Sequence, residues 1–110
     1  MKEVYKLKCR NKTKSLLQIK EMLKAGLNTE FICEERFMDD NVVFMCFEQY
    51  YIRCSNFVAL SVMLVENEDC QEAVVVGMGG GNGVLNMSWG ANRSFAKKAI
   101  KCLGDIGFAE

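Results

Sequence analysis

The chain has 110 residues, of which half are hydrophobic and a quarter are charged. These fractions are typical of a globular protein and exclude a disordered one, and the length suits a single domain over residues 1–110. Fourteen basic and fourteen acidic side chains cancel, so neither nucleic acid nor a membrane is expected as a partner. The N-terminus has no signal-peptide pattern, and no apolar run approaches the roughly 20 residues that span a bilayer. We therefore expect a cytoplasmic protein.

The six cysteines are widely spaced, form no C-x-x-C pair and are accompanied by no histidine. Structural zinc sites usually take ligands that lie in close sequence pairs. The pattern predicts free, mostly buried thiols in a reducing compartment, with no metal and no cofactor.

The first elements are a strand and a helix. Val4–Cys9 alternates loosely and reads as a strand. Ser15 and Gln18 fit a capping box ahead of an apolar helical face. These signals predict a helix over Lys14–Ala25, which Gly26 ends.

Strands dominate the middle of the chain, and a second helix follows near Ala91 with Gly104 and Gly107 at its end. The predicted strands are Phe31–Met38, Val42–Arg53, Phe57–Val65 and Glu72–Met78, with a shorter last strand over Val84–Trp89.

This order predicts an α+β fold. Hairpin-length connections imply an antiparallel sheet of five or six strands, with both helices on one face. The element order β-α-β-β-β-β-(β)-α is that of TATA-binding-protein-like and helix-grip-like folds. The analogy is one of order alone and carries no function.

The central strands are apolar on both faces. In Val42–Arg53 one face carries Val42, Phe44, Cys46, Tyr50 and Ile52, and the other carries Val43, Met45, Phe47 and Tyr51. An antiparallel sheet with one wet face should instead alternate apolar and polar residues. Three covers are open for the second face: a cavity that holds an apolar ligand, a homodimer, which we favour, or the chain's own termini and loops.

The run "GMGGGNG" at Gly77–Gly83 resembles a phosphate loop only superficially. Asn82 stands where a dinucleotide fingerprint needs its third glycine, and no Gly-Lys-Ser/Thr closes a Walker loop. The simpler interpretation is a hairpin turn with left-handed residues. The alternative is a lid, or a nest of backbone N–H groups for an anion.

Few residues suit catalysis. Without histidine the commonest general base is missing. Cys54, beside Arg53 at a predicted turn, is the best candidate for an activated thiol. Glu48 lies among apolar neighbours and is either a carboxylate with a raised pKa or, as we favour, the partner of Arg36 or Arg53 in an ion pair. A small enzyme that uses Cys54 or Glu48 is therefore the alternative function.

Three blocks carry a resemblance: "FEQYYIRCSN" at residues 47–56, "GGGNG" at 79–83 and "SWG" at 88–90. In this order they resemble a family of short bacterial proteins of unknown function. The resemblance implies that the three blocks form one motif set. It assigns no activity to that set.

Aromatic walls, an arginine for a negative group and a glycine lid would together form a binding site. The residues predicted for it are Tyr50, Tyr51, Arg53, Gly79, Gly80, Gly81, Asn82, Gly83, Trp89 and Arg93. The predicted function is non-catalytic binding of a small-molecule ligand or a protein partner by a homodimer.

Overall fold

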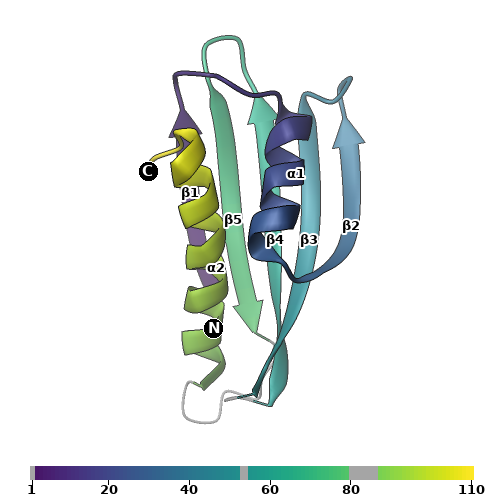
Figure 1. The fold of residues 1–110 in the computed structure, drawn as a ribbon, viewed down its shortest axis with the longest axis vertical. Helices are drawn as coiled ribbons and strands as arrows, with labels where there is room; N and C mark the ends of the chain where they lie inside the picture. Colours follow the sequence, from purple (N-terminus) through teal and green to yellow (C-terminus); the bar gives the residue numbers. More distant parts are fainter. Residues whose placement is uncertain (1, 53–54, 80–86) are drawn as a thin grey trace.

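The computed structural model describes residues 2–52, 55–79 and 87–110 (Figure 1). The elements are β1 (Lys2–Cys9), α1 (Leu16–Leu27), β2 (Glu30–Phe37), β3 (Val42–Tyr51), β4 (Asn56–Glu66), β5 (Gln71–Gly79) and α2 (Met87–Ile106).

All neighbouring strands are antiparallel, and the sheet order is β1-β5-β4-β3-β2. Both helices lie side by side against the same face of the sheet, as Figure 1 shows. The predicted α+β fold with an antiparallel sheet is confirmed, with five strands in the sheet. We call the face under the helices the helix face and the opposite one the open face.

The core lies between the helices and the helix face. Alternate residues of the central strands are fully buried there because successive side chains point to opposite faces. From the sheet these are Val43, Met45, Phe47, Val58, Leu60, Val62, Leu64, Ala73 and Val75; from the helices they include Leu16, Ile19, Leu23, Leu27, Phe95, Ala99 and Leu103.

Helix α1 begins at the predicted capping box. The Ser15 hydroxyl accepts from the Gln18 N–H at 3.2 Å, and the Gln18 side chain accepts from the Ser15 N–H at 2.9 Å. The helix does not stop at Gly26, however, and ends at Leu27 with Asn28 in the left-handed conformation (φ 47°). A Cβ at Gly26 would lie 2.5 Å from Cys102 Sγ on α2, so this glycine allows the two helices to approach closely.

Helix α2 begins at Met87, earlier than the sequence predicts. Met87–Trp89 therefore belong to a helix rather than to the short last strand expected over Val84–Trp89. Gly107 (φ 120°) ends the helix, as predicted, and Phe108 N–H donates to Leu103 O at 3.0 Å. The next residue, Ala109, pairs with Lys8 and covers part of the β1 edge.

A bulge in β2 changes which face its residues occupy. Phe31 pairs with Phe47 on the helix face, but Cys33 pairs with Cys46 on the open face, because Ile32 is an extra residue between them. Strict alternation along the predicted strand Phe31–Met38 would put Phe31, Cys33 and Phe37 on one side. The bulge places Cys33 and Phe37 on the side opposite Phe31.

A polar cluster ties the β1–α1 connection to the β4–β5 hairpin. The buried amide of Gln71 donates to Lys14 O at 2.7 Å and to Glu66 Oε1 at 2.9 Å. Lys12 Nζ donates to Glu66 Oε2 at 2.8 Å and to Asn67 O at 2.8 Å. The Gln71 Oε1 atom is buried without a partner among the described residues, so these donated bonds are what hold the side chain in place.

We expect Gly26→Ala to destabilise the protein by about 1 kcal/mol, because the steric clash with Cys102 outweighs the better helix propensity of alanine. In a Cys102→Ala background the same change should stabilise the protein by about 0.5–1 kcal/mol. Chemical denaturation of the four proteins of this double-mutant cycle measures the coupling. Equal effects in both backgrounds would show that the close approach is irrelevant.

The pH dependence of stability should report on Glu66. Burial raises the pKa of this carboxyl, but the hydrogen bonds from Lys12 and Gln71 and the charge of Lys12 outweigh it and hold the pKa below the ordinary value of 4.5. The resulting stabilisation is present above the unfolded-state pKa and is lost as the pH falls below 4.5 towards the folded-state pKa.

We therefore expect Glu66→Gln to lower the free energy of unfolding by about 1 kcal/mol at pH 7. At pH 3 the free energies of unfolding of the variant and the wild type should differ by less. Denaturant titrations at both pH values measure this difference. A difference that does not change with pH would assign the loss to packing rather than to charge.

Candidate functional site

The open face is built from cross-strand rows. One row crosses all five strands from β1 to β2 and contains Lys6, Val74, Met63, Phe44 and Glu35. The row on one side of it contains Val4, Val76, Ser61, Cys46 and Cys33; the row on the other side contains Lys8, Glu72, Val65, Val42 and Phe37. The middle of each row is mostly apolar, and none of the helices or strands of the structure covers it.

The apolar surface lies mainly on the three central strands. At roughly 4.8 Å between strands and 3.3 Å per residue, the whole open face spans roughly 700 Å² with the charged residues of its edge strands included, and its apolar middle on β5, β4 and β3 spans roughly 480 Å². Its large side chains stay half-buried or exposed, with Met63 at 37%, Phe57 at 48% and Phe37 at 54% of full exposure. The largest apolar patch of a typical monomer covers about 300–600 Å² and is often functional, so the apolar middle of the open face has the size of an interaction surface.

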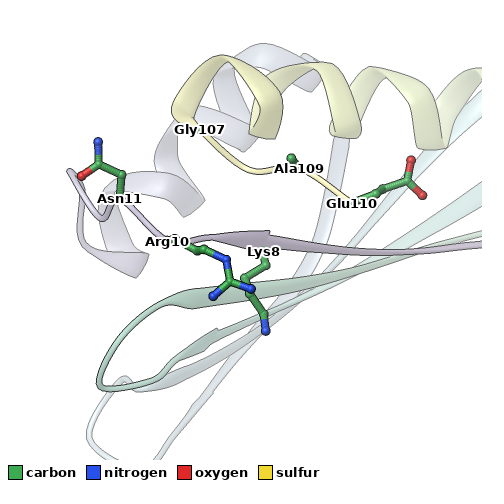
Figure 2. Close-up of a pocket in the computed structure, with 6 residues that line it drawn as sticks. All are labelled: Lys8, Arg10, Asn11, Gly107, Ala109 and Glu110. Atoms are coloured by element: carbon green, nitrogen blue, oxygen red, sulfur yellow. The ribbon is translucent and has the colours of Figure 1, made fainter.

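Charges gather at opposite edges of the open face. The β1 edge carries exposed basic residues, and the β2 edge carries exposed acidic ones. We call Lys6, Lys8 and Arg10 the basic margin and Glu30 and Glu35 the acidic margin. In Figure 2 the Lys8 and Arg10 side chains point away from α2, towards the open face. Lys8 lies 3.8 Å from Glu72 of β5.

Two thiols lie side by side on the open face, one on β2 and one on β3. Cys33 pairs across the strands with Cys46, and Cys46 Sγ lies 3.6 Å from Ser61 Oγ. Burial, the hydrogen bond and charge of Cys46, and the carboxylate of Glu35 all raise the pKa of the Cys33 thiol. Cys33 is therefore protonated near neutral pH and is a poor nucleophile.

The structure separates the two tyrosines of the predicted binding site. Tyr50 is on the open face, where its ring meets Phe57 edge-on at 5.2 Å between centroids. Tyr51 is on the helix face, 6.3 Å from the Phe95 ring. Adjacent residues of a strand point to opposite faces, so these two rings do not line one pocket.

Arg93, another residue of that site, lies on α2 and interacts with β1. Its Nε lies 3.3 Å from Glu3 Oε1, which also accepts from the Tyr5 hydroxyl at 2.7 Å. This trio attaches the first half of α2 to the sheet edge. The hydrogen bond to Glu3 raises the pKa of Tyr5, and burial and the charge of Glu3 act in the same direction, against Arg93.

The other predicted site residues are only partly described. Gly79 ends β5, and Trp89 belongs to the first turn of α2. Arg53, Gly80, Gly81, Asn82 and Gly83 lie outside the described residues, and so does Cys54. The predicted ligand site therefore stays a prediction.

Glu48 lies on the open face beside Ala59, and the predicted ion pair with Arg36 does not form. Arg36 instead contacts Glu34 at 3.2 Å and Asp40 at 3.6 Å. The strand register explains the difference, because Glu48 lies opposite Glu30 whereas Arg36 lies opposite Val43, at the other end of the β2–β3 pair.

The hollows that described residues line are open to solvent or small. One of about 500 Å³ lies at the end of β1, and Figure 2 shows its long side chains, Arg10 and Glu110 among them, pointing apart rather than towards one another. Another of about 470 Å³ lies along the outer side of α1 around Leu17. The open face itself has a hollow of about 160 Å³, lined by Lys6, Leu7, Met63, Val65, Glu72, Ala73 and Val74.

The described residues form neither a metal-binding cluster nor a membrane-spanning helix. Among the residues that the structure describes, no three Cys, Asp or Glu side chains are grouped as a metal site would require. Neither described helix combines the length and apolar character needed to cross a membrane.

Comparison with known proteins shows the family to which the chain belongs. Residues 9–107 match a family of unknown function, DUF6054. The chain belongs to this family. The predicted resemblance to a family of unknown function is thereby confirmed. No curated protein and no solved structure matches the chain.

Proposed function

We propose that this DUF6054 protein is a non-catalytic binding module that associates with a protein surface through the open face of its sheet. The observation that carries the proposal is the apolar area of the open face, which is bordered by charge on two edges. An apolar centre with a polar rim is the common anatomy of protein interfaces.

Among the described residues, the sizes of the hollows favour a protein over a small molecule as partner. Ligand pockets usually enclose about 300–1,000 Å³ between apolar walls. The open-face hollow holds about 160 Å³, which suits one side chain of a partner. The two larger hollows lie along charged or polar side chains at the surface, such as Arg10 and Glu21, and do not enclose a ligand.

The titratable groups of the open face also favour binding over catalysis. The pKa of Cys33 is raised by burial, by Cys46 and by Glu35, which is opposite to what a nucleophilic thiol needs. Cys9, Cys33, Cys46, Cys70 and Cys102 are all free, which supports a reducing compartment such as the cytoplasm as the location.

A matched pair of methionines tests the surface. Met63, in the centre of the open face, is 37% exposed, and Met22, on the outer side of α1, is 40% exposed. In an extract of the producing cells, the wild-type protein should elute in gel filtration above the 12.4 kDa of a monomer. Met63→Lys should shift it to the monomer position, because a charge at the centre of an apolar interface stays unpaired. Met22→Lys should change nothing.

A monomeric wild-type protein in the extract would contradict the proposal, and so would equal behaviour of the two variants. Thermal unfolding of both purified variants controls for loss of the fold.

A further inference from the structure

The geometry points to a second copy of this chain as the occupant of the open face. Specifically, we infer a two-fold dimer whose axis lies between the two sheets, parallel to the strands. The inference rests on the proposed function and adds the identity of the partner and its orientation.

Face-to-face packing is the arrangement that the sheet edges leave available. At the β1 edge, Lys8 exchanges two backbone hydrogen bonds with Ala109, at 2.7 and 3.0 Å, so part of this edge is already paired. At the β2 edge, the bulge between Phe31 and Cys33 and the exposed Glu30 and Glu35 interrupt strand pairing. Bulges and charges are how proteins prevent edge-to-edge association.

The area of the open face suits a dimer of this kind. Its roughly 700 Å² is close to the roughly 800 Å² per partner that a stable protein interface buries. Two stacked sheets pack about 10 Å apart with their strands within about 30° of each other. The small side chains of Ala59 and Ser61, on the open side of the central strand β4, allow such an approach along the middle of the interface.

The charges at the two margins select the axis. β1 and β2 are the two edge strands. β4 is the central strand, with β5 on one side of it and β3 on the other. A two-fold axis parallel to the strands carries β1 of one copy over β2 of the other, so each basic margin meets an acidic margin. An axis perpendicular to the strands would place basic over basic and acidic over acidic. Facing like charges is costly, whereas complementary potentials fix the orientation.

About this axis, each cross-strand row of one copy lies over the same row of the other copy, running in the opposite direction, and the facing residues are complementary. The row that starts at Lys6 and ends at Glu35 would lie over the same row running backwards, so that Lys6 of each copy faces Glu35 of the other. Phe44 would then face Val74 of the second copy. That position is a wall of the 160 Å³ hollow, which the Phe44 ring would fill. Each hollow would receive one ring, as a symmetric interface requires.

The first test is the mass of the purified protein by sedimentation equilibrium. We expect twice the monomer mass of 12.4 kDa. A purified monomer would overturn this inference, while a larger assembly in the cell extract would leave the proposed function intact with a different protein as partner.

Charge reversals then test the axis. Lys6→Glu and Glu35→Lys each create two like-charge contacts in the inferred dimer, and each should raise the dissociation constant about tenfold at low salt. The double variant Lys6→Glu/Glu35→Lys restores opposite charges at both contacts and should dimerise like the wild type. Lys97→Glu on α2 and Glu68→Lys in the β4–β5 turn make the same changes of net charge at exposed positions away from the open face, and should have no effect.

The results distinguish the orientation of the dimer from the surface through which it forms. Single reversals that leave the dissociation constant unchanged would overturn the axis. A double variant as weak as the single ones would do the same. If Met63→Lys still dissociates the dimer in either case, the open face remains the binding surface and only the orientation fails.

Discussion

Two helices can bury only one face of a five-stranded sheet, and this limit determines the character of the whole molecule. α1 and α2 cover the helix face and bury side chains such as Phe47 and Leu60 completely. The residues between them, such as Phe44 and Met63, are apolar as well but remain partly exposed. A sheet that meets water on one face would carry polar residues there. The apolar second face is therefore the feature on which the proposed association rests.

Much of the fold was predictable because the signals are local. The two-residue period of Val42–Tyr51 and the capping box at Ser15 depend only on neighbouring residues. Three features were not predictable in this way. Gly26 is needed because Cys102 of α2 lies against it. Met87–Trp89 are helical although the preceding glycines indicate a turn. The β2 bulge depends on the pairing of β2 with β3. The register of β2 on β3, which puts Arg36 and Glu48 at opposite ends of the strand pair, made the predicted Arg36–Glu48 pair wrong.

The candidate surface was predictable in kind and not in detail. The sequence shows that both faces of β3 and β4 are apolar, which is enough to expect a covered second face. It does not show that Lys6 and Glu35 end the same row, because that requires the order of all five strands. The two-residue period already places Tyr50 and Tyr51 on opposite faces, and the structure shows the same separation. Strand pairing, rather than closeness in sequence, decides which side chains act together.

A sheet that is apolar on both faces has a weak hydrophobic preference for one alignment of its strands. Sliding a strand by one residue exchanges its faces, and here the exchange replaces apolar residues with apolar residues. Correct alignment therefore depends on the short hairpin turns and on polar contacts that exist in one register only. Gln71 donates to Lys14 O and Glu66, and the Thr29 hydroxyl donates to Glu48 O at 2.7 Å. These few hydrogen bonds contribute modestly to stability, but they make one strand alignment distinct from its neighbours.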